Sequence, residues 1–173
     1  MENEVIKTLT ERRSVRRYIK KQVEEEKLEL ILKAGTYAPS GMGSQSPIMV
    51  VVQDPETISL LNRLNAVAMG SSGDPFYGAP TVVIVLADKN MWTCVEDGSL
   101  VMGNLMNAAF SLGVDSCWIH RAKEVFETKE GKELLKKWGI GENYIGVGNC
   151  ILGYRDGALP SARMRKNNYI YRV

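Results

Sequence analysis

Apolar and polar positions repeat along the chain with two different periods, which separate expected helices from expected strands. Apolar residues recur every three or four positions, the period of an amphipathic helix, over residues 2–11, 23–38, 55–68 and 122–139. β-Branched apolar runs, which are typical of buried strands, form PIMVVVQD, TVVIVLAD and YIGVGNCILGY. The shorter segment VDSCWIH predicts a further strand. Helices and strands are therefore expected to be interspersed along the chain.

Two further segments favour contact with a second chain. The stretch from Asp97 to Leu112, DGSLVMGNLMNAAFSL, is apolar nearly all round, which predicts a helix buried on most faces and passing through a subunit interface. The irregular tail, about residues 155–173, ends in YIYRV, an apolar-polar alternation with no neighbouring strand in the sequence. A terminal strand of this kind can complete the sheet of another subunit and cover its edge.

Length and composition indicate a single folded domain that spans residues 1–173. Hydrophobic residues make up 45% of the chain and charged residues 24%, close to the average of globular proteins. A net charge of +2 gives no broad positive field, so we expect no nucleic-acid partner. The sequence shows neither a signal peptide nor an apolar run of roughly 18 residues, so we expect no membrane association and a cytoplasmic location.

The side chains that usually perform catalysis are scarce. The three cysteines are widely spaced with no CxxC pair, which argues against both a disulfide framework and a zinc site. His120 is the sole histidine, so we expect no metal site built from imidazoles and no conventional acid–base triad unless His120 itself is the base. This scarcity favours a bound cofactor that carries out the chemistry.

Positive charge is concentrated in two clusters, one near each end of the chain. Six of the twelve residues in TERRSVRRYIKK are Arg or Lys, and a second cluster, SARMRK, lies in the tail. Each cluster pairs arginines with a serine, Ser14 or Ser161, and guanidinium and hydroxyl groups together can bind phosphate oxygens. A basic run taken alone is more often a solvated surface, so that alternative stays open here.

Two other segments carry groups suited to a heterocyclic ligand. The loop APSGMGSQSP is rich in Gly and Ser, and its Gln45 amide can both donate to and accept from a ring edge. The strand VDSCWIH ends on Trp118, Ile119 and His120. The simpler interpretations are a plain connecting loop, a core tryptophan and a structural or surface histidine.

These motifs, taken in order, resemble the nitroreductase family of FMN-dependent oxidoreductases. The series is ERRSVRRY, APSGMGSQSP, YGAPTVVIV, DGSLVMGNLMNAAFSLGVDSCWI and GNCILGY followed by RMRK, and it covers nearly the whole chain. The resemblance implies an α+β fold with a central mixed β-sheet flanked by helices. It also implies an intertwined homodimer in which the C-terminal strand is exchanged to the partner sheet, with FMN sites at the subunit interface.

The resemblance assigns cofactor-binding residues position by position. The FMN phosphate falls to Arg12, Arg13, Ser14 and Arg16, joined by Arg163 and Arg165 from the tail. The loop that covers the flavin ring from the other subunit matches at Pro39, Ser40 and Gln45. Backbone groups at the N5 and O4 edge of the flavin correspond to Trp118, Ile119 and His120. The chain departs from the family pattern at Met42, Gly43, His120 and Arg121, which affects one ring contact and the choice of substrate or nicotinamide.

The implied activity is an FMN-dependent oxidoreductase that takes hydride from NADH or NADPH. It would then reduce a nitroaromatic, quinone, flavin or enone by a ping-pong mechanism. Two alternatives remain: a specialised enzyme of the same fold, either flavin-fragmenting or reductively dehalogenating, and a non-catalytic protein that binds a phosphate or nucleotide.

Overall fold

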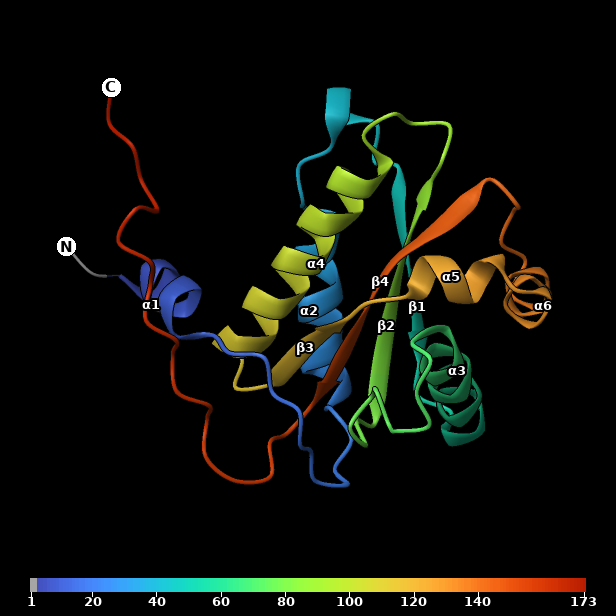
Figure 1. Ribbon diagram of the computed structural model, residues 1–173, viewed down its shortest axis with the longest axis horizontal. Helices are drawn as coiled ribbons and strands as arrows, with labels where there is room; N and C mark the ends of the chain where they lie inside the picture. The colour runs from blue at the N-terminus through green and yellow to red at the C-terminus, as the bar shows by residue number, and fades with distance from the viewer. Residues whose placement is uncertain (1–2) are drawn as a thin grey trace.

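The structure, a computed structural model that describes residues 3–173, is built on a four-stranded sheet with helices on both faces (Figure 1). The strands are β1 (Pro47–Val52), β2 (Thr81–Asp88), β3 (Asp115–Ile119) and β4 (Tyr144–Gly153), in the order β1-β2-β4-β3. All three strand pairs are antiparallel. Within residues 3–173, parallel pairing is confined to one isolated bridge between Ser14 and Ser116. The expected α+β fold is confirmed, but the expected mixed sheet is wrong, because its four strands pair only in antiparallel fashion and the one parallel bridge involves Ser14, which lies outside them.

Strand β2 forms the centre of the core, because its residues from Thr81 to Ala87 are all buried. Successive side chains of a strand point to opposite faces, and the two faces of β2 meet two different apolar clusters. Val82, Ile84 and Leu86 pack with one cluster, to which α3 (Pro55–Ala68), α5 (Ala122–Glu127) and α6 (Lys129–Lys137) contribute. Val83, Val85 and Ala87 pack with the other, to which α2 (Glu25–Thr36) and α4 (Cys94–Ser111) contribute.

The single helix expected over residues 122–139 is wrong, because the chain forms two helices that meet at Thr128. The Thr128 hydroxyl donates to the Val125 carbonyl at 2.7 Å and accepts from the Gly131 amide at 3.0 Å, so one side chain ends α5 and caps α6. At Gly131 a Cβ atom would lie 2.0 Å from the Val125 carbonyl oxygen. This contact requires glycine there and allows the second helix to turn closely over the first.

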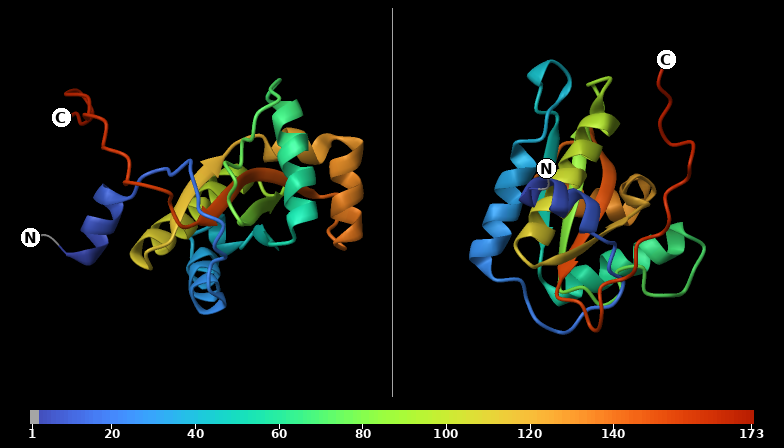
Figure 2. Two further views of the ribbon diagram at one scale, coloured as in Figure 1. Left: turned by 90° about the horizontal axis from the view of Figure 1, so that it is seen from below. Right: turned by 90° about the vertical axis from the view of Figure 1, so that its left-hand side faces the viewer.

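Helix α1 (Glu4–Glu11) and the C-terminal tail lie side by side, away from the sheet (Figure 2). Within the described residues α1 buries no side chain, and its apolar residues Val5, Ile6 and Leu9 are exposed. The expected helix 2–11 is confirmed from Glu4 onward, and residue 2 lies outside the described part. The tail beyond Asp156 is extended and forms no strand within residues 3–173, so YIYRV has no partner strand in its own chain.

Helix α4 is buried along one side only. Met102, Leu105 and Ala109 are inaccessible to solvent, whereas Val95 and Leu100 are about half exposed, at 52% and 46%. The expectation of burial on most faces is therefore met only in part by the single chain.

Three thiols, at Cys94, Cys117 and Cys150, are buried and form no disulfide. Burial raises the pKa of the Cys150 thiol to about 12. Residues 3–173 contain no helix whose length and apolarity suit a membrane crossing, and no group of acidic, Cys and His side chains there could hold a metal ion.

Candidate functional site

The N-terminal basic segment is fixed to the sheet by backbone hydrogen bonds. After α1 the chain crosses one edge of the sheet, where the Val15 amide donates to the Ser116 carbonyl at 3.0 Å. Farther along, the Ile19 amide donates to the Tyr154 carbonyl at 2.9 Å. These bonds hold the arginines of RRSVRR beside the start of β3 and the end of β4.

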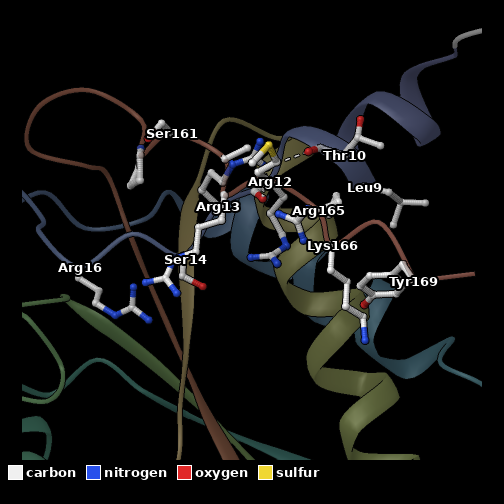
Figure 3. Close-up of a pocket in the computed structure, with 14 residues that line it drawn as sticks. Leu9, Thr10, Arg12, Arg13, Ser14, Arg16, Ser161, Arg165, Lys166 and Tyr169 are labelled. Atoms are coloured by element: carbon white, nitrogen blue, oxygen red, sulfur yellow. Dashed lines mark hydrogen bonds between the residues drawn. The ribbon is translucent and has the colours of Figure 1, made fainter.

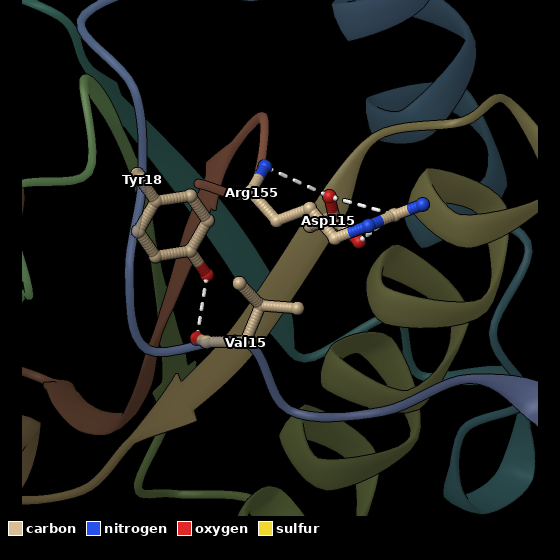
Figure 4. Close-up of polar contacts among 4 residues, drawn as sticks. All are labelled: Val15, Tyr18, Asp115 and Arg155. Carbon is tan, nitrogen blue, oxygen red and sulfur yellow. Dashed lines mark hydrogen bonds and ion pairs between the residues drawn. The ribbon is translucent and has the colours of Figure 1, made fainter. Parts of the chain in front are cut away.

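An ion pair between a buried carboxylate and a partly exposed arginine fixes the point at which the C-terminal tail leaves β4 (Figure 4). The Asp115 side chain is 3% exposed, and its two oxygens accept from Arg155 Nη1 at 2.9 and 3.1 Å. The Arg155 amide also donates to Asp115 Oδ2, at 3.0 Å. Beside the pair, Tyr18 donates to the Val15 carbonyl at 2.9 Å, and burial holds the pKa of its phenol well above the usual value. Both basic segments are therefore anchored at the same place.

The two basic clusters meet in a cavity of about 1200 Å³ (Figure 3). The polar and charged side chains that line it are Thr10, Arg12, Arg13, Ser14, Arg16, Ser161, Arg163, Arg165, Lys166 and Tyr169. No Asp or Glu is among its described lining residues, so the positive charge is not compensated locally. The structure thus brings together every arginine that the sequence assigned to phosphate binding.

Two arginines that line this cavity each hold a buried donor with no acceptor in residues 3–173. Arg13 Nη1 donates to the carbonyls of Thr10 and Arg12, at 2.7 and 2.8 Å. The two unpaired donors are Arg12 Nη1 and Arg13 Nε. Burying unpaired donors is costly, most of all on a charged group. A phosphate monoester supplies several acceptor oxygens and two negative charges, so the cavity fits such a group.

The Gly-Ser loop is held by a buried carboxylate that the sequence analysis missed. Asp97 of α4 is 2% exposed and accepts from the Gly41 amide at 2.9 Å, the Ser46 hydroxyl at 2.7 Å and the Thr93 hydroxyl at 3.1 Å. Burial by itself raises the pKa of Asp97, but these hydrogen bonds outweigh it and hold the pKa below its usual value. The signal in the sequence was one of two adjacent acidic residues, Glu96 and Asp97, at the start of an apolar helix.

The same loop has a strained backbone. Met42 and Gln45 have φ angles of 53° and 50°, in the left-handed region that non-glycine residues avoid, at a cost of about 1–3 kcal/mol each. Ser40 Oγ accepts from the Gln45 amide at 2.9 Å and closes the loop. Pro39, Ser40 and Gln45 line a small cavity of about 120 Å³ between α2, β1 and α4, and none of the three lines the cavity of the arginines.

The third group of expected residues lies at the end of β3. Ser14 pairs with Ser116, and a strand rises about 3.3 Å per residue, so Ile119 lies roughly 10 Å farther along β3 than the Ser14 bridge. Trp118 is half-buried against Gly148, Ile119 is buried and His120 is exposed. The chain then turns through Arg121, whose φ of 77° is left-handed and whose guanidinium pairs with Glu124 at 2.6 Å. Within one chain, the strand end and the arginine cavity share one edge of the sheet, whereas the Gly-Ser loop lines a separate cavity.

Comparison with known proteins shows which family the chain belongs to. The nitroreductase family model matches residues 9–73. The crystal structure of a nitroreductase with bound FMN from Bacteroides fragilis is 33% identical, with a TM-score of 0.92, and the match covers 99% of this chain and 100% of that one. A protein of Archaeoglobus fulgidus with the provisional name NADH dehydrogenase/NAD(P)H nitroreductase is 32% identical over 87% of this chain and 85% of its own length. The chain belongs to the nitroreductase family.

A second nitroreductase crystal structure with bound FMN, from Desulfitobacterium hafniense, is 25% identical, with a TM-score of 0.89 over 99% of both chains. The nitroreductase fold thus extends over nearly the whole chain, including the tail that carries Arg163 and Arg165. Sequence reasoning identified the arginines because they stand in two visible clusters. It missed Asp97 and the Asp115–Arg155 pair because their partners are 40 to 56 positions away.

Proposed function

We propose that residues 1–173 form one FMN-binding domain of an NAD(P)H-dependent oxidoreductase. The observation that carries the proposal is the cavity that Arg12 and Arg13 line without any acidic residue, because each of these half-buried arginines also holds one buried guanidinium nitrogen that has no hydrogen-bond partner in residues 3–173. Related nitroreductases have been crystallised with FMN bound. The positive charge and the donors of the cavity suit the phosphate end of that cofactor.

The residues of this chain would hold FMN at both of its ends. Arg12, Arg13 and Ser14, with Arg163 and Arg165 from the tail, would bind the phosphate. The backbone at Trp118, Ile119 and His120 would face the flavin edge, because it lies along β3 from the Ser14 bridge. FMN, when bound, supplies a site that accepts hydride from a donor and passes it to an acceptor. The protein then has to bind and orient FMN and the substrates and to exclude water from the site. No side chain needs to act as the acid or base.

NADH or NADPH would act as donor, followed in the same pocket by a nitroaromatic, quinone, flavin or enone acceptor in a ping-pong sequence. The uncompensated positive charge of the arginine cavity supports an anionic nicotinamide cofactor as the donor, because it would attract that cofactor. His120 and Arg121 stand beside the proposed flavin edge, where they would influence which donor or acceptor is accepted. The cytoplasmic location and the absence of a nucleic-acid partner stay predictions.

The protein would work as a homodimer with sites built from both chains. Three exposed apolar surfaces support this: Val5 and Leu9 of α1, Leu100 of α4, and the tail residues Ile170 and Tyr171. Apolar surface of this extent is typical of a protein interface. A second chain would cover it and could bring its own Pro39, Ser40 and Gln45 over the flavin, which would explain why these residues line a separate cavity in one chain.

The visible absorption spectrum of the purified protein, before and after anaerobic addition of NADH and then NADPH, tests the proposal. We expect flavin bands that bleach with at least one donor, and reoxidation by nitrofurazone or menadione would then identify acceptors. A colourless protein that stays colourless after incubation with FMN would contradict the proposal. It would favour instead a phosphate-binding protein without redox activity.

A further inference from the structure

The side chain of Asn65 is a buried polar group that the proposed site does not explain. It lies in α3 with no solvent exposure, between the buried residues Leu64 and Ala66. Its amide nitrogen donates to the carbonyl of His120 at 2.9 Å, across 55 positions of sequence. Its amide oxygen has no hydrogen-bond partner in residues 3–173.

This half-satisfied amide is a poor choice for stability alone. A buried acceptor without a partner is destabilising, and an apolar residue of similar size would avoid that loss in a helix that packs into the core. The one bond that Asn65 makes is directed at the end of β3. The presence of Asn65 at this position is therefore explained by what that bond does to the His120 carbonyl.

The bond to the carbonyl of His120 also fixes the direction of the next amide. His120 C=O and Arg121 N–H belong to one peptide unit, which is planar and trans, so the two groups point in opposite directions. Because Asn65 binds the carbonyl from the side of α3, the Arg121 N–H points away from α3. No acceptor for this N–H is found in the part of the chain that the structure describes.

The backbone at Arg121 is also held in an unfavourable conformation. Its φ of 77° is left-handed, and its side chain is tied to Glu124 one turn into α5. Strained backbone of this kind persists where surrounding contacts determine it, and such positions cluster at ligand sites. The Asn65 bond on one side and the Glu124 pair on the other are those contacts.

We propose that Asn65 is a positioning residue, which orients the peptide between His120 and Arg121 so that the Arg121 N–H donates to the edge of the bound flavin ring. The inference rests on the proposed function, because the acceptor is FMN. It assigns to a buried residue of α3 the task of preparing a donor that lies at the end of β3.

Amide hydrogen exchange at Arg121, followed by NMR with and without FMN, tests this directly. In the wild-type protein we expect FMN to slow exchange of this amide by at least about tenfold, the effect of one hydrogen bond. The same measurement is made on Asn65→Leu and on the control Asn62→Leu. Asn62 lies one turn earlier in α3, and its side chain accepts from the Phe76 amide at 3.0 Å, away from the proposed site.

We expect FMN to protect the Arg121 amide in Asn62→Leu but to change its exchange by less than about twofold in Asn65→Leu. The FMN dissociation constant of Asn65→Leu, from titration of the apoprotein, should rise about tenfold, while its urea midpoint stays close to that of the wild type, because removal of the buried unpaired amide oxygen offsets loss of the bond to His120. Loss of affinity without loss of stability separates positioning from a structural role.

Protection of Arg121 by FMN that is equal in Asn65→Leu and in wild type would overturn the inference and leave the proposed function intact. Wild-type protein that binds FMN with no change at the Arg121 amide would overturn it as well, and this result needs no variant to fold. Wild-type protein that binds no FMN would instead refute the proposed function, and the inference would fail with it.

Discussion

The arginines of this protein differ in whether their guanidinium N–H groups have hydrogen-bond acceptors within the described chain. Arg155 is satisfied by Asp115, and Arg63 pairs with Glu130 at 3.0 Å on the surface. Arg12 and Arg13, by contrast, bury N–H groups with no acceptor in the described chain. The unpaired guanidinium groups are therefore the ones that gain most from an anion.

Replacing arginines on both sides of the cavity should remove the cofactor. For Arg12→Ala combined with Arg165→Ala we expect FMN affinity to fall at least about a hundredfold, since two charge-assisted hydrogen bonds are lost. Titration of the apoprotein, followed by flavin fluorescence, measures it. Arg63→Ala is the matched control, because the side chains of Arg63 and of its partner Glu130 are both more than half exposed. Equal affinity in the double variant and the control would refute the assigned phosphate site.

Asp97 is the residue on which the Gly-Ser loop depends. Asp97→Asn turns one acceptor into a donor that faces other donors, so we expect a loss of roughly 2–4 kcal/mol in the free energy of unfolding. Urea denaturation measures this loss, with Glu96→Gln, on the exposed side of the same helix turn, as the control. A change below about 0.5 kcal/mol in Asp97→Asn would show that the loop is held by other contacts.

The ionisation of Asp97 should contribute to the pH dependence of the free energy of unfolding. The pKa of Asp97 in the folded chain lies below its usual value. The ionised carboxylate therefore stabilises the folded state fully above the pKa of the unfolded chain, and this stabilisation is lost as the pH falls through the pKa of the folded chain. We therefore expect the stability difference between wild type and Asp97→Asn to be constant near neutrality and to shrink below about pH 4. Urea midpoints from pH 2 to 7 measure it, and a difference that grows toward acid would contradict the assignment.

Among the elements, the break between α5 and α6 depends on one glycine. A Cβ at Gly131 would lie 2.0 Å from the Val125 carbonyl, so Gly131→Ala must push the two helices apart. We expect a destabilisation of about 1–3 kcal/mol, measured by thermal or urea unfolding. Lys132→Ala, one exposed position farther along α6, should change stability by no more than about 0.5 kcal/mol. Equal effects of the two substitutions would mean that the helices do not pack this closely.

Elements with a strong local signal could be predicted from the sequence, and those set by contacts could not. TVVIVLAD gave β2 with both ends correct, because an unbroken β-branched run between Pro80 and Lys89 has one reasonable interpretation. The α5–α6 break was missed because Thr128 suits both a helix and a cap, and the contact of Gly131 with Val125 decides between them. In the site, the arginine clusters were visible, whereas Asp97 and Asn65 act through partners more than 50 positions distant.

At the scale of the whole molecule, the exposed apolar surface predicts a dimer. Sedimentation equilibrium should give twice the chain mass of 19.3 kDa for the wild type. Ile170→Asp combined with Tyr171→Asp places two charges on tail residues that are 75% and 77% exposed in the single chain, and we expect monomers with weakened FMN binding.

The control for the tail is Val67→Asp, at a residue that is 68% exposed on α3, on the opposite face of the sheet from α4. It should remain dimeric, because exposure alone does not make an interface. A tail variant that stays dimeric would show that the two chains associate without the tail. A Val67→Asp monomer would move the interface to the α3 face.

The three buried cysteines allow local unfolding of this protein to be followed by thiol labelling. Cys117 faces one apolar cluster, Cys150 faces the other, and Cys94 stands at the first turn of α4. A thiol-specific reagent in solution reaches each of them only when the surrounding packing gives way. The order in which the sulfurs become labelled would then give the order in which the two layers and the helix start come apart, with no foreign probe introduced.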